Sequence, residues 1–249
     1  MSFLKSVALA VTVAAAASAV PASALTTFGS SSVVTTPNLY YVNSGSAANS
    51  QLYTTNGAVV PAGSALSVFS VSSAVIGFLP LAATLTNFTL NASVPTLTGF
   101  TAGSPFSISG VSGSFSFTAL APVTVGMNTG VNILTAAFTN ATLAGTFGSS
   151  SISLSGNDSV GTLIYSSDFL DFSNVDSVAF ALTGNTTNPL SVSPTGRLAT
   201  FRSSVNGNFA SNPPPSLPIV PEPETWAMLV IGFGLVGVTM RRRKSVVTA

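Results

Sequence analysis

The side chains that most often carry out catalysis are scarce in this sequence. Cysteine and histidine are both absent, which excludes a disulfide, a thiol nucleophile, a zinc site and a histidine general base. Lys5 is followed by no other lysine until Lys244, so neither Ser–Lys chemistry nor a Schiff base is available between them. The sequence therefore predicts a protein that is not an enzyme and that holds no cofactor.

Clustered carboxylates are the side chains best placed to bind a ligand. Asp168, Asp171 and Asp176 lie close together in the sequence, with Asp158 shortly before them. Carboxylate oxygens are the ligands that Ca²⁺ prefers, but the spacing does not match an EF-hand loop. A glycosidase acid–base pair is disfavoured because no second charged wall accompanies it. We expect these acids to cap turns and expect no metal site, with Asp168, Asp171 and Asp176 as the Ca²⁺ candidates to test.

Charge is distributed unevenly along the chain. The formal net charge is +1, yet four of the seven basic residues form the run Arg241–Lys244. No charged side chain occurs between Lys5 and Asp158, so Ser, Thr, Asn and Gly must cover the surface there. Such a surface offers little electrostatic resistance to self-association. No segment of the body resembles a phosphate-binding face, which argues against a nucleic-acid partner.

The N-terminus has the three parts of a secretory signal peptide. Lys5 provides a basic start, Ser6–Val20 is apolar and rich in alanine, and Ala22-Ser23-Ala24 forms a small-residue cleavage site. We predict that residues 1–24 are a signal peptide cleaved after Ala24. Ala17-Ser18-Ala19 is the alternative cleavage site.

The C-terminal part contains four segments in a fixed order. A proline-rich linker over residues 211–220 precedes Pro221-Glu222-Pro223-Glu224, the uncharged apolar stretch Thr225–Met240 and the basic run Arg241-Arg242-Arg243-Lys244. A helix over residues 225–240 would span about 24 Å, less than the roughly 30 Å of the hydrocarbon core. Interfacial Trp226 and the arginine side chains can extend that span. We predict one transmembrane helix over 225–240, with residues 245–249 in the cytoplasm and the body outside.

This tail resembles the PEP-CTERM sorting signal in its PEPxxWA form, found in Gram-negative bacteria. The resemblance rests on Pro221-Glu222-Pro223, on Trp226-Ala227 at the start of the apolar stretch, and on the basic run that ends it. It implies recognition by an exosortase, removal of the tail near the PEP motif, and transfer of the body to the cell surface or the extracellular space. Members of this family are often associated with exopolysaccharide and biofilm. The membrane anchor would then be transient.

Residues 25–210 have the pattern of an all-β domain. Apolar and polar residues alternate over Phe88–Val94 and Ser114–Thr118, which is typical of half-buried strands. Short strands separated by turn residues predict a single β-sandwich or jelly-roll-like domain. The apolar positions change parity near Gly110 and Gly113, so we expect a bulge at one of them. The acidic region 158–176 is expected to hold the last strands, and residues 206–218 to form linker.

Two functions from different classes remain for this body. The first is a structural or interaction component of the cell envelope or biofilm matrix, whose Ser, Thr and Asn faces bind exopolysaccharide or other surface proteins. The alternative is a carbohydrate-binding or adhesin module, assisted by Ca²⁺. Exposed aromatic side chains would favour the second, since sugars stack on Trp or Tyr. The candidates are Tyr40, Tyr41, Tyr53 and Tyr165.

Overall fold

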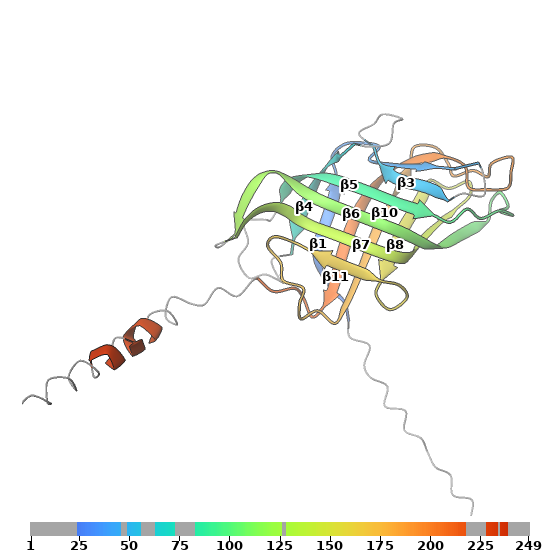
Figure 1. The fold of residues 1–249 in the computed structure, drawn as a ribbon. Coiled ribbons are helices and arrows are strands. Elements are labelled where there is room, and N and C mark those ends of the chain that lie inside the picture. The colour runs from blue at the N-terminus through green and yellow to red at the C-terminus, as the bar shows by residue number, and fades with distance from the viewer. Residues whose placement is uncertain are drawn as a thin grey trace, which may run out of the picture.

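The described part of the chain folds into antiparallel strands (Figure 1). The computed structural model describes residues 24–45, 49–55, 63–72, 83–125, 128–217, 228–233 and 235–238. The strands, in chain order, are β1 (Thr26–Val33), β2 (Leu39–Val42), β3 (Ser50–Thr54), β4 (Ala65–Val71), β5 (Thr84–Val94), β6 (Pro105–Val125), β7 (Asn128–Thr146), β8 (Ser151–Asn157), β9 (Leu163–Ser166), β10 (Ser177–Thr186) and β11 (Phe201–Asn212).

Eight of these strands close into a barrel, so the expected sandwich or jelly-roll is wrong although the all-β class is confirmed. The circuit runs β1–β4–β5–β6–β7–β8–β10–β11 and returns to β1, with every pair antiparallel. The closing pair joins β1 to β11, for example Ser30 to Asn208. Alternation of buried and exposed residues is the same in a sandwich and in a barrel, because both bury one face of each strand. Only the pairing distinguishes them.

Between β5 and β11 the wall is built from two short pairs of strands. The pair β1–β4 contacts the C-terminal half of β11 and the N-terminal half of β5. The pair β2–β3 contacts the opposite halves, with Phe201 opposite Tyr41 and Ser50 opposite Val94. Each of β5 and β11 therefore changes its partner partway along its length. At those two points the ladder of backbone hydrogen bonds is interrupted.

Side chains fill both interruptions. Buried Asn38 donates from Nδ2 to the carbonyl oxygen of Val205 at 3.0 Å, and the Val205 N–H donates back to Asn38 Oδ1 at 2.9 Å. On β5, the Leu90 N–H donates to Thr54 Oγ1 at 3.3 Å. Buried backbone groups without partners are costly, so these two side chains take the place of the missing ladder bonds.

Phenylalanine fills much of the barrel interior. Phe209 is fully buried, and its ring centroid lies 5.4–5.5 Å from those of Phe69, Phe115 and Phe117. Phe180 contacts Phe115 at 5.1 Å from the opposite wall. Rings from strands far apart in sequence thus meet in one aromatic core, and such contacts add to the free energy gained from burial of their area.

The predicted alternation is confirmed where it was clearest. Phe88, Leu90, Ala92 and Val94 are all buried on one face of β5. The expected bulge is also present, because the β6–β7 register shifts on both sides of Val111. Gly110 has φ +81°, a conformation that glycine adopts without strain. The bulge resets the face, so that apolar side chains on both sides of it point inward.

Two expectations about the C-terminal third differ from the structure. The acidic region 158–176 contains only the short strand β9 and one isolated bridge, and the last strands are β10 and β11. Residues 206–212, expected in the linker, belong to β11, where Gly207 and Phe209 are inward positions. A side chain at Gly207 would crowd the Phe209 ring, with 2.6 Å from its Cβ to Phe209 Cζ. Glycine and asparagine residues over 206–212 weaken the alternating pattern that indicates a strand. The inward position Gly207 nevertheless requires a small residue.

The expected membrane helix falls only partly on described residues. Helix covers residues 228–233 and 235–238. Within the described ranges, no helix is both long enough and apolar enough to cross a bilayer.

Candidate functional site

The acidic candidates each bind a different stretch of main chain. Asp168 follows β9, and its Oδ2 accepts the N–H groups of Val131 at 2.9 Å and of Asn132 at 2.8 Å. The Asp168 N–H donates to the Asn132 carbonyl at 2.9 Å. These three bonds attach the segment after β9 to the N-terminal part of β7.

Asp171 and Asp176 fasten the C-terminal end of the domain. Asp171 exchanges two backbone hydrogen bonds with Ser216, at 2.7 and 3.1 Å. Its Oδ1 accepts the Ser173 N–H at 2.8 Å, and bonds from the backbone and side chain of Ser173 lower the pKa of Asp171. Asp176 donates its N–H to the Asn212 carbonyl at 2.9 Å. Among the described residues, no three acidic side chains are grouped closely enough to hold a metal ion.

The four tyrosines divide into two inward and two outward residues. Tyr41 is buried and stacks on Phe201 at 5.1 Å. Tyr165 is buried, packs edge-to-face on Phe28 and donates its hydroxyl to the Ala179 carbonyl at 2.7 Å. Tyr40 and Tyr53 lie directly opposite each other on β2 and β3, with ring centroids 5.4 Å apart and edge-to-face. Only this outward pair can serve a ligand.

The outward tyrosines belong to a row of side chains that crosses five neighbouring strands. Direct cross-strand partners link Arg202 to Tyr40, Tyr40 to Tyr53, Tyr53 to Asn91 and Asn91 to Ser114. Residues directly opposite each other lie on the same face of a sheet. We call these five residues the Arg202–Ser114 row. Four interstrand spacings make it about 19 Å long.

Each member of the row brings a different chemical group to the outer face. Arg202 places its guanidinium carbon 5.5 Å from the centroid of the Tyr40 ring, a cation–π distance. Asn91 and Ser114 are exposed, Tyr40 is half-buried and Tyr53 is 9% exposed. Burial raises the pKa of Tyr53, the neighbouring Tyr40 raises it further, and Arg202 opposes the shift. The Tyr53 hydroxyl therefore stays protonated at neutral pH.

Two surface depressions flank the tyrosine pair. Arg202 and Tyr40 line the first together with Asn188, Thr187, Ser191 and Thr200. The second is lined by Tyr53, Asn91 and Ser114, together with Gln51, Thr54 and Thr89. Apart from Arg202, the polar groups in both depressions are uncharged amides and hydroxyls, which can donate and accept hydrogen bonds.

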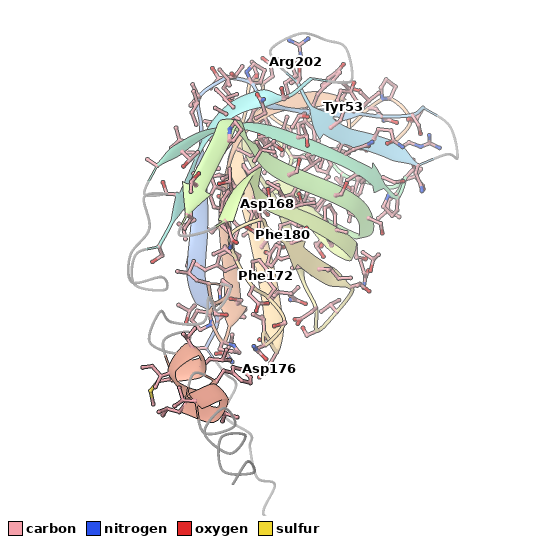
Figure 2. All side chains as sticks on the ribbon, turned by 60° about the vertical axis from the view of Figure 1, so that its left-hand side comes forward. Tyr53, Asp168, Phe172, Asp176, Phe180 and Arg202 are labelled. Carbon is pink, nitrogen blue, oxygen red and sulfur yellow. The ribbon has the colours of Figure 1, made fainter. Side chains whose placement is uncertain are left out.

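The row lies far from the ends of the domain. Thr26 pairs with Ser211, so the first strand starts beside the point where the last one ends. Arg202 precedes Ser211 on the same strand, a separation of about 30 Å along extended chain. Figure 2 shows Arg202 and Tyr53 at one end of the barrel and Asp176 at the other. Sequence reasoning named the tyrosines but missed Arg202, Asn91 and Ser114, because only the register aligns them.

The sorting residues lie outside the described part of the chain. These are Pro221, Glu222, Pro223, Trp226, Ala227, Arg241, Arg242, Arg243 and Lys244. Of the two signal-cleavage residues, Ala22 is also outside it, and Ala24 is exposed two residues before β1. The first described strand, β1, begins at Thr26.

Comparison with known proteins finds a family match in the tail. A family model described as the PEP-CTERM protein-sorting motif matches residues 220–244, as the resemblance of the tail indicated. The motif marks exported proteins that are sorted toward the cell surface by an exosortase. No curated protein and no solved structure is significantly similar to the chain.

Proposed function

We propose that this chain is an exported exosortase substrate whose C-terminal tail anchors it briefly in the membrane and is then removed, leaving the barrel at the cell surface or outside the cell. The observation that carries the proposal is the sorting motif at residues 220–244. It combines the recognition sequence, an apolar stretch and a basic run in the order that such processing requires. The exosortase is the partner in this step.

The extent of the folded domain supports removal of both ends. The last strand ends at Asn212, and the last bridge joins Asp171 to Ser216. Cleavage near Pro221 would therefore leave every strand of the described residues intact. Cleavage after Ala24 would do the same at the other end, since β1 begins at Thr26.

Exposure of the tail supports its transfer into an apolar environment. In the described residues 228–233 and 235–238, all the large side chains are apolar and at least half of each is exposed, Met228 at 72% and Phe233 at 71% among them. A helix that is apolar all round is found in the core of a protein or in a membrane. A transient membrane anchor is the role that fits a removable tail.

For the barrel we propose an interaction role, associated with exopolysaccharide or biofilm, rather than catalysis. The support is chemical: the sequence lacks His and Cys, and the carboxylates Asp168 and Asp171 accept hydrogen bonds from main-chain N–H groups. The outward faces of the strands carry mainly Ser, Thr and Asn, which suit hydrogen bonding to hydrated polymers.

The sorting proposal is tested by replacing Pro221, Glu222 and Pro223 with Ala in a host that carries an exosortase. We expect an unprocessed, membrane-bound chain, because the recognition element is lost while the apolar stretch remains. Pro218→Ala, a proline outside the matched residues, is the control and should be processed normally. The C-terminus of each form is read by mass spectrometry of the membrane and surface fractions. Identical processing of all forms, or unchanged processing after deletion of the exosortase gene, would refute the proposal.

A further inference from the structure

The Arg202–Ser114 row combines the groups that recognise a sugar chain. Aromatic rings provide apolar surface with a polar edge, and Tyr40 and Tyr53 supply this at the centre of the row. The flanking depressions add side-chain amides from Gln51, Asn91 and Asn188 and hydroxyls from Ser and Thr residues. Both kinds of group match sugar hydroxyls as donors and acceptors. The length of the row, about 19 Å, suits an extended polymer better than a single small molecule.

Arg202 adds a requirement for negative charge in the ligand. It is one of two cationic side chains in residues 24–217, and within the described residues it forms no ion pair. A guanidinium can bind a carboxylate through two parallel hydrogen bonds, which are stronger than bonds between neutral groups. Contact with the Tyr40 ring holds Arg202 at the edge of the first depression, so less side-chain freedom is lost on binding.

The overall charge argues against a nucleic-acid ligand. Residues 24–217 carry Arg197 and Arg202 against Asp158, Asp168, Asp171 and Asp176, a net charge of 2 − 4 = −2. Binding to a phosphate backbone depends on several cationic side chains along the contact. A polymer with a carboxylate on a sugar ring needs one cation beside apolar and uncharged polar surface, which is the arrangement around Tyr40.

We propose that the Arg202–Ser114 row and its two depressions bind an acidic polysaccharide, with Arg202 paired to a uronate carboxylate and Tyr40 packed against a neighbouring sugar ring. Asn91 and Gln51 bind sugar hydroxyls on the far side of the tyrosine pair. This deepens the proposed interaction role by naming a site and a ligand class. The row lies at the end of the barrel away from Asn212 (Figure 2).

The test uses the purified full chain in detergent, with alginate as the polyuronate, dextran as the neutral polymer and dextran sulfate as the polyanion without carboxylates. Binding is measured by affinity electrophoresis and by titration calorimetry. We expect saturable binding of alginate that is at least tenfold tighter than binding of either other polymer, and that weakens as salt is raised.

Substitutions separate the site from general effects of charge. Arg202→Gln should weaken alginate binding at least tenfold, while Arg197→Gln, the same charge change outside both depressions, should leave it unchanged. Tyr40→Ala should weaken binding and Tyr40→Phe should largely retain it. Thermal melting of every variant checks that it is folded. If Arg202→Gln fails to fold, Arg202→Lys is used, and it should bind alginate more weakly because the two-bond contact is lost.

Several results would overturn the proposal. They are equal effects of the two arginine substitutions, dextran or dextran sulfate bound as tightly as alginate, and no alginate binding at all. Because binding is measured on the purified chain and sorting on the C-terminus made in cells, failure of one proposal does not conceal failure of the other.

Discussion

The side chain of Asn38 exchanges two hydrogen bonds with the main chain of Val205, one in each direction, at 3.0 and 2.9 Å. Asn38 is 1% exposed, and it lies where β11 changes its partner from β2 to β1. An asparagine amide has the same donor and acceptor groups as a peptide. It therefore continues the ladder across the junction between two short pairs of strands.

Replacing Asn38 with Ala should destabilise the barrel by more than about 2 kcal/mol, because a buried donor and a buried acceptor of Val205 each lose a partner at roughly 1–3 kcal/mol. Asn208 is an exposed residue on β11, the strand that also contains Val205. The Asn208→Ala control should change stability by less than about 0.5 kcal/mol. Urea unfolding of both variants measures the difference. Equal decreases in the free energy of unfolding for the two variants would show that the hydrogen bonds between Asn38 and Val205 do not stabilise the barrel.

Tyr165 should make the protein sensitive to alkaline pH. Burial raises its pKa well above the ordinary value of 10.0, and the charge of Asp158 raises it further. Above about pH 10 the unfolded chain releases a proton that the folded chain retains. The free energy of unfolding should therefore fall as pH rises past that point, whereas below it the titration of Tyr165 adds no pH dependence.

The Tyr165→Phe substitution tests this assignment. It should reduce the alkaline loss of stability, and at neutral pH it should cost about 1 kcal/mol through the lost bond to the Ala179 carbonyl. The exposed neighbour Ile164, changed to Ala, is the control and should leave the pH dependence unchanged. Stability measured by urea unfolding at neutral pH and above pH 10 gives both values. An identical alkaline slope in Tyr165→Phe and the unmodified chain would contradict the role given to Tyr165.

Calcium should leave the melting temperature unchanged. Each of the three carboxylate residues, Asp168, Asp171 and Asp176, forms hydrogen bonds with a different segment of main chain. Among the described residues, their side chains do not gather around one point that could hold an ion. A ligand that binds only the native state would raise the melting temperature by mass action. Thermal melts with and without CaCl₂ are compared for the unmodified chain and for Asp171→Asn. A saturable rise that disappears in Asp171→Asn would establish a calcium site and reverse this expectation.

Several features of the chain follow from local sequence alone. The alternation over Phe88–Val94 and the register change at Gly110 depend on neighbouring residues, and both occur as expected. The tail motif is a continuous segment, so its identification needs no fold. The strand over residues 206–212 escaped recognition because Gly207 and the asparagines weaken its pattern, although contacts with Phe209 and Ser31 favour a residue without Cβ there.

Closure of the barrel and the composition of the outward row were decided by tertiary structure. Ser30 pairs with Asn208 across most of the chain, and nothing in the alternation of either strand specifies that partner. The same holds for Arg202, Tyr40 and Asn91, which become neighbours only through the pairings of β11, β2, β3 and β5. The alternation of apolar and polar residues along each strand determines which of its side chains are buried. Which strands then lie side by side depends on how well the whole set of buried faces packs, and that is a property of the assembled barrel.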